Sequence, residues 1–213
     1  MKKILILVLL SFSLSVNAQS LNEIFLKIPD VYFKDFKEVC NDNLTLEGRK
    51  ALLNNKKYKV FEIETLDSKN GYLSFFTNTD GEGMAGYLTY WRFQHSILAA
   101  LVIDHNANCT DYSKDIYFFE YQNGKLVDVS KSFNPKLGIK DFNITDPQVL
   151  STFKDNFSTI WRLPKEGKKI KIYAFHYDCG GDWYPANGIY FELEPNSSKT
   201  FKIVKSYEKN PNE

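Results

Sequence analysis

Residues 87–104 read YLTYWRFQHSILAALVID and predict two consecutive strands, 87–93 and 96–104. Both segments are rich in aromatic and aliphatic side chains, which pack well on the pleated surface of a sheet. The second segment carries apolar residues on both of its faces. We therefore expect other parts of the chain to cover this strand from both sides.

Short segments of the same kind lie on either side of this pair. Seven more strands are predicted, at residues 58–66, 72–77, 115–121, 126–129, 169–176, 188–194 and 200–205. The dipeptide Asn70-Gly71 lies between the first two and favours a tight hairpin turn. The sequence Gln-Asn-Gly at 122–124 joins the next two in a similar way. By contrast, residues 80–86 contain three glycines and predict a flexible loop.

Three segments predict helices. Ser20 and Glu23 form a capping box in front of apolar residues that share one helical face. A second, short helical stretch covers residues 46–53. The third segment has the strongest helix signal, because Thr145 and Gln148 form another capping box ahead of a single apolar face. That face is made of Val149, Leu150, Phe153 and Phe157.

Many short strands with few helices predict an α+β fold, in which two or three helices pack on one side of a largely antiparallel sheet of short strands. We expect a single domain over residues 19–207 and a frayed tail over 208–213. Within this domain, 97–130 and 170–206 share an order of features: strand, His and Cys, an acidic residue before aromatic ones, strand, turn, strand. The spacings differ, so either an internal duplication into two related α/β-meander units or a shared loop-and-hairpin design explains the order.

The first 18 residues have the layout of a secretory signal peptide. Lys2 and Lys3 precede a short apolar stretch, and a segment of small residues ends at Ala18. A membrane-spanning helix needs about 20 apolar residues, and serines interrupt this stretch too early. We therefore expect cleavage after Ala18, a mature chain that starts at Gln19 in the periplasm or outside the cell, and no stable membrane insertion.

The mature chain is close to electrically neutral. Cleavage removes two of the 27 basic residues and none of the 26 acidic ones, which leaves 25 against 26 and a formal charge of −1. Proteins that bind nucleic acid usually carry a surplus of basic residues. We therefore expect a protein or a glycan as partner and no nucleic acid.

Three cysteines remain after cleavage: Cys40, Cys109 and Cys179. Two of them are expected to pair in an oxidising compartment, and a Cys109–Cys179 disulfide would join the corresponding loops of the two similar segments. The alternatives are that Cys40 pairs with either one or that all three thiols are unpaired. His105 and His176 precede these two cysteines with spacings that suit zinc, but thiolates of exported proteins tend to oxidise. We expect no metal site.

The loop at residues 177–188 contains the best candidate for a binding surface. Trp183 and Tyr184 lie there among turn-forming residues, where no strand pattern requires aromatic side chains. Exposed aromatic residues on loops are typical of surfaces that bind sugars or proteins. With the disulfide in place, Tyr112, Asp182, Trp183 and Tyr184 would gather at one end of the sheet as a binding site. The alternative is that the aromatic residues fold back over the core as a lid.

The sequence contains none of the common catalytic or cofactor motifs. It has no Gly-x-Ser-x-Gly, no His-Glu-x-x-His and no phosphate-binding glycine loop, and its only histidines are His95, His105 and His176. We therefore expect no catalytic residues and no cofactor, and we favour an exported, non-enzymatic binding protein of the cell envelope or exterior. The alternatives are a secreted hydrolase acting on extracellular polymers and an inhibitor of a secreted enzyme.

Residues 21–30 read LNEIFLKIPD and are followed by short strands, a helix and more strands. This start and this order resemble small secreted bacterial proteins of uncharacterised function, and the motif Ile28-Pro29-Asp30 is the specific part of the resemblance. The layout is also similar to the helix-plus-antiparallel-sheet repeats of the beta-lactamase inhibitor protein family. Neither resemblance implies catalytic residues, since a shared architecture does not transfer function.

Overall fold

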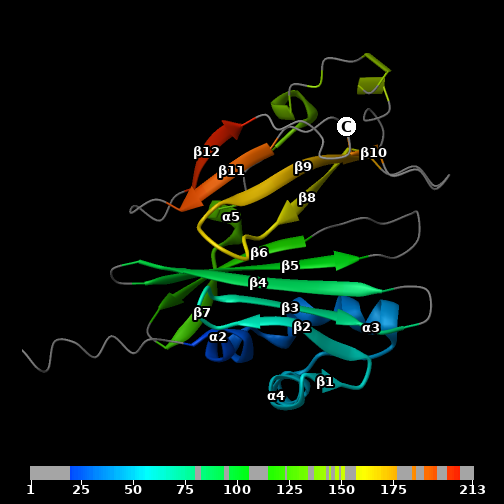
Figure 1. Cartoon of the computed structure of the whole chain (residues 1–213), viewed down its shortest axis with the longest axis vertical. Helices are drawn as coiled ribbons and strands as arrows, with labels where there is room; N and C mark the ends of the chain where they lie inside the picture. The colour runs from blue at the N-terminus through cyan, green and yellow to red at the C-terminus, as the bar shows by residue number, and fades with distance from the viewer. Residues whose placement is uncertain are drawn as a thin grey trace, which may run out of the picture.

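The computed structural model of the protein describes residues 20–79, 83–93, 96–105, 115–122, 124–133, 137–142, 144, 147–148, 150–151, 157–176, 184–185, 190–195 and 201–206. It confirms the predicted α+β class. A seven-stranded antiparallel sheet has helices on one face and a second, smaller sheet on the other (Figure 1). These three layers enclose two separate apolar cores, one on each face of the larger sheet.

The larger sheet is a meander in which each strand pairs with the strand that follows it in the sequence. Its strands are β1 (Lys57–Tyr58), β2 (Phe61–Asp67), β3 (Tyr72–Thr77), β4 (Met84–Arg92), β5 (Ile97–His105), β6 (Asp115–Gln122) and β7 (Lys125–Asp128). Every neighbouring pair is antiparallel. The predicted hairpins around Asn70-Gly71 and around residues 122–124 are confirmed, and Gly71 and Gly124 both adopt positive φ angles there.

The loop prediction for residues 80–86 is wrong at its C-terminal end, because β4 begins at Met84. Gly86 lies directly opposite Phe75 of β3. The Phe75 ring occupies the space that a side chain at residue 86 would need. Glycine therefore serves here to let an aromatic ring lie across a strand, and not to make a loop flexible.

Helices cover one face of this sheet. They are α2 (Leu21–Lys27), η1 (Asp30–Phe33), α3 (Asp35–Cys40) and α4 (Leu46–Asn55). At α2 the Ser20 half of the predicted capping box is present, since the Ser20 hydroxyl accepts a hydrogen bond from the Glu23 amide. A second cap that the sequence analysis did not identify begins α4, where Thr45 accepts from the Gly48 amide. The short η1 and α3 were not predicted either, because neither is long enough to show helical periodicity.

The buried side chain of Arg49 joins α4 to the loop that follows α2. It is 1% exposed, and its guanidinium donates to the Asp30 carboxylate at 2.8 Å and to the Ile28 carbonyl at 2.7 Å. It also donates to the Leu44 carbonyl at 2.9 Å and lies 4.6 Å from the centre of the Phe33 ring. The motif at residues 28–30 thus has a structural role, because it supplies hydrogen-bond acceptors for a buried cation.

The second sheet covers the opposite face of the larger one. Its strands are β8 (Ser158–Arg162), β9 (Ile170–His176), β10 (Tyr184–Pro185), β11 (Tyr190–Pro195) and β12 (Phe201–Ser206). The strand β9 pairs with β8, β10 and β11, and β11 pairs with β12. Trp161, Ile170 and Ile172 from this sheet share a core with residues of β4, β5 and β6. Since the helical layer covers its other face, β5 is covered from both sides, as predicted.

The segment between the sheets differs in part from its prediction. Residues 147, 148, 150 and 151 are helical, but Phe157 lies outside any helix and precedes β8, a strand that was not predicted. The Phe157 ring packs 5.7 Å from that of Phe142, at the end of the short η2 (Ile139–Phe142). The apolar spacing of Phe157 therefore reflects packing against η2. The short helix α5 (Ser130–Phe133) lies between β7 and η2 in the sequence.

The two segments with a shared order of features both contain three antiparallel strands in sequence order. These are β5, β6 and β7 in 97–130, and β9, β11 and β12 in 170–206. The two sets belong to different sheets. The segment 170–206 also contains the short strand β10, which pairs with β9. Duplication and the single-domain boundaries stay predictions, and the tail at 208–213 lies outside the described residues.

Candidate ligand-binding site

Most of the predicted site lies outside the described residues. This holds for Tyr112, Asp182 and Trp183 and for both cysteines of the predicted Cys109–Cys179 disulfide, so the site and the bridge stay predictions. Tyr184 is described by its backbone, which pairs in β10 with residue 176 of β9. Tyr184 is therefore a strand residue and not a loop residue.

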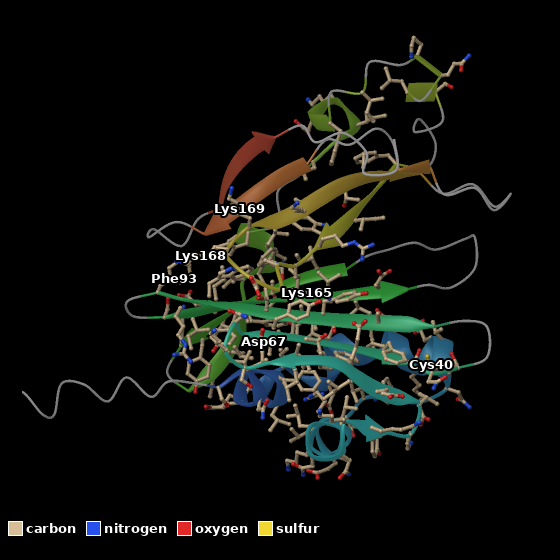
Figure 2. All side chains as sticks on the ribbon, in the orientation of Figure 1. Cys40, Asp67, Phe93, Lys165, Lys168 and Lys169 are labelled. Atoms are coloured by element: carbon tan, nitrogen blue, oxygen red, sulfur yellow. The ribbon has the colours of Figure 1, made fainter. Side chains whose placement is uncertain are left out.

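The part of the chain that the structure describes contains no disulfide. Cys40 ends α3 and packs partly buried against the core on the helical side of the larger sheet (Figure 2). No cluster of three or more His, Cys, Asp or Glu side chains suitable for a metal ion occurs among the described residues. Within the same residues, no helix is both long and apolar enough to cross a membrane.

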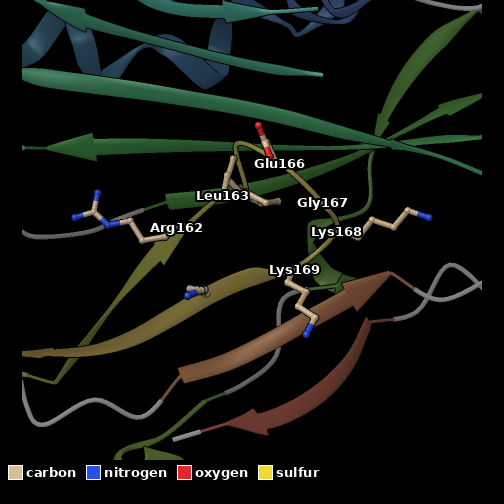
Figure 3. A pocket seen from close by; sticks show the side chains of 8 residues that line it. Arg162, Leu163, Glu166, Gly167, Lys168 and Lys169 are labelled. Atoms are coloured by element: carbon tan, nitrogen blue, oxygen red, sulfur yellow. The ribbon is translucent and has the colours of Figure 1, made fainter. Parts of the chain in front are cut away.

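A different surface emerges at the turn between β8 and β9, which we call the basic turn and define as residues 162–171. Its sequence is RLPKEGKKIK, with five basic residues and one acidic residue. An open hollow of about 510 Å³ lies beside this turn (Figure 3). The hollow is lined by Arg162, Leu163, Pro164, Glu166, Gly167, Lys168, Lys169 and Lys171.

Buried side chains on both flanking strands hold the basic turn in place. Trp161 of β8 lies opposite Ile172 of β9, and both are buried in the core between the sheets. Leu163 and Ile170 are buried at the two ends of the turn. Because side chains alternate along a strand, the intervening cations are left near the surface. The cations of the basic turn are therefore carried by backbone segments that buried side chains hold in place.

The pairing of β8 with β9 sets two cations against each other. Arg162 lies directly opposite Lys171, and like charges in such a position destabilise a strand pair. On its other side, Lys171 lies opposite Glu192 of β11. The basic turn carries a formal charge of +4 in a chain whose total formal charge is +1. The register therefore places one acidic residue beside these two cations, while the basic turn as a whole keeps a net positive charge.

Two tyrosines of the larger sheet contact the cations of the basic turn. The Lys165 ammonium lies 5.9 Å from the centre of the Tyr72 ring. Burial raises the pKa of Tyr72 to about 12. Burial and the nearby Asp104 carboxylate raise the pKa of Tyr87, while a hydrogen bond from Arg162 acts in the opposite direction. Both tyrosines are therefore neutral at physiological pH, and the Tyr72 ring helps to hold Lys165 in place.

The basic turn was not among the predicted sites, although its signal is local and visible in the sequence. Five of the ten residues at 162–171 are Lys or Arg, arranged around Pro164 and Gly167. The total charge of the chain does not reveal this cluster, because acidic residues elsewhere in the sequence balance its positive charge. A charge count in short windows would have found it.

Comparison with known proteins gives no relative from which a role could be carried over. The resemblances of residues 21–30 and of the overall layout therefore stay predictions. No family model, no curated protein and no solved structure matches this chain.

Proposed function

We propose that this chain is an exported, non-enzymatic binding protein of the cell envelope or exterior, and that it holds an anionic ligand at the basic turn. The observation that carries the proposal is the concentration of five cationic residues within 162–171, on a turn whose flanking strands are fixed in the core. The net formal charge of +4 on the basic turn attracts an anion placed beside it.

This role requires export, because an envelope or exterior protein must leave the cytoplasm. The mature protein is expected to start at Gln19, since the charged start, the short apolar stretch and the small residues before it form a cleavable signal. Mass spectrometry of protein recovered from the periplasm or the medium measures the N-terminus directly. An intact Met1 in that material would contradict export by this route.

Reversing charge in the basic turn is expected to weaken binding. The double variant Lys168→Glu with Lys169→Glu changes the formal charge of 162–171 from +4 to 0. We expect co-sedimentation of the purified mature protein with cell-envelope material to fall by about tenfold or more, and high salt to produce a similar loss in the unaltered protein. Thermal unfolding of the variant checks that it is folded.

The matched control is Lys34→Glu with Lys37→Glu, which makes the same change in total charge. Both lysines are exposed and lie at and within α3, on the helical side of the larger sheet. This variant is expected to bind almost as well as the unaltered protein. An equal loss in both variants would mean that only total charge matters, and no loss in the first would place the binding surface elsewhere.

A further inference from the structure

We infer that the ligand of the basic turn is an extended acidic polysaccharide, held through several of its carboxylate or sulfate groups along the turn. The inference rests on the proposed function, because it names the class of anion that the same site takes. The proposed ligand is a polymer with repeated negative charges. A single small anion and a nucleic acid are the competing ligands.

The cations around the hollow do not converge on one point. Figure 3 shows the Arg162 side chain directed to one side of the hollow and that of Lys168 to the other, while Lys169 points away from the larger sheet. A compact anion such as phosphate would therefore contact only one or two of them. A polymer with negative charges at intervals contacts several of these cations at once, and each added contact raises its overall affinity for the protein.

The chemistry of the cations also suits separated acidic groups. A guanidinium such as that of Arg162 forms paired hydrogen bonds with a planar carboxylate, and lysines act as point charges on flexible stems. The contact of Lys165 with the Tyr72 ring restrains one further cation of the basic turn before a ligand arrives. Restraint of this kind lowers the entropy lost on binding.

Part of the lining of the hollow is apolar, which favours a sugar over an inorganic ion. Leu163 and Pro164 are among the lining residues, and Leu163 is 8% exposed. Sugar rings present C–H faces that pack on such a surface, whereas an inorganic anion gains nothing from it. The volume of about 510 Å³ falls within the range of small-molecule sites, roughly 300–1,000 Å³. One portion of a longer chain would fill it.

The lining residues argue against nucleic acid. None of the eight side chains that line the hollow is aromatic. Sites for single-stranded nucleic acid typically stack bases on aromatic rings, and that stacking supplies much of the affinity. The hollow offers charged and apolar lining residues, which match a charged sugar polymer and leave bases without an aromatic stacking surface.

The test measures binding of the mature protein to galacturonic acid and to oligomers of increasing length by isothermal titration calorimetry. We expect affinity to rise by about tenfold or more from the monomer to the long oligomers, as several contacts form on one chain. Dextran sulfate in a second arm distinguishes sulfate from carboxylate as the preferred group. Methyl-esterified polygalacturonate, which lacks most of the charge, is expected to bind at least about tenfold more weakly than the charged polymer.

Variants connect this readout to the basic turn. Lys168→Glu is expected to reduce both the affinity for long oligomers and the gain with length, while Lys34→Glu leaves both unchanged. Inorganic phosphate that binds as tightly as the long oligomers would overturn the inference, as would a thymidine oligonucleotide that binds more tightly than both polyanionic sugars. If neither charged polysaccharide binds while envelope co-sedimentation still depends on the basic turn, the ligand class is wrong and the proposed function survives. If the charged polysaccharides do not bind and co-sedimentation does not depend on the basic turn, both the inference and the proposed function are wrong.

Discussion

Replacing Arg49 with methionine is expected to lower the free energy of unfolding by about 3–5 kcal/mol. The guanidinium donates to the carbonyls of Ile28 and Leu44, and both of these hydrogen bonds are buried. Each buried acceptor that loses its donor costs about 1–3 kcal/mol. Methionine fills much of the space beside Phe33 but supplies no hydrogen-bond donor. Chemical denaturation followed by fluorescence measures the change.

The control for this prediction is the next residue of the same helix, Lys50→Met. The Lys50 ammonium is half exposed and pairs with Glu47 on the surface of α4. Exposed pairs of this kind contribute at most about 1 kcal/mol, so this variant should unfold close to the unaltered protein. Equal stability of the Arg49 and Lys50 variants would show that the buried guanidinium does not join α4 to the loop at residues 28–30.

Replacing Gly86 with alanine is expected to destabilise the protein by about 3 kcal/mol, a large effect for one methyl group. The added Cβ would overlap the ring of Phe75, which lies across the strand at this residue. The ring has little room to move, because its centre lies 5.6 Å from that of Phe25 and 5.7 Å from that of Phe36. The clash must therefore shift β4 or separate the aromatic cluster.

Gly83→Ala provides the comparison, since residue 83 immediately precedes β4. A Cβ there would lie 3.6 Å from the Thr77 carbonyl oxygen, an ordinary contact. We expect a change within about 0.5 kcal/mol, typical of substitutions that touch nothing new. Thermal unfolding of the two variants under the same conditions separates the effect of the Phe75 ring from a general effect of losing glycine. A Gly86 variant as stable as the Gly83 variant would contradict the packing described here.

Local signals account for what the sequence predicted well. The cap of α2 depends on Ser20 and Glu23, which are three residues apart, and the hairpin at Asn70-Gly71 depends on a dipeptide. The double coverage of β5 was visible because apolar residues occupy both of its faces. Each of these features is encoded within one segment, so no knowledge of distant contacts was needed.

The errors arose where distant contacts decide the structure. Gly86 was read as part of a loop because its partner, Phe75, lies in another strand. Phe157 has a spacing that fits a helix, but it packs on Phe142 instead. For the candidate site, the charge of 162–171 was present in the sequence, whereas its position beside Tyr72 and Tyr87 depends on how the sheets pack. Sequence spacing could not supply that arrangement.

The meander of the larger sheet bears on the order in which the chain assembles. Each strand from β1 to β7 pairs with the strand next to it in the sequence. The loops that must close are therefore short, and the entropy lost in closing them is small. A chain that emerges N-terminus first therefore presents the helices and the whole larger sheet before β8 appears. Trp161, Ile170 and Ile172 then meet a surface already built from β4, β5 and β6. We therefore expect the second sheet, and the basic turn with it, to form on the surface of the larger sheet.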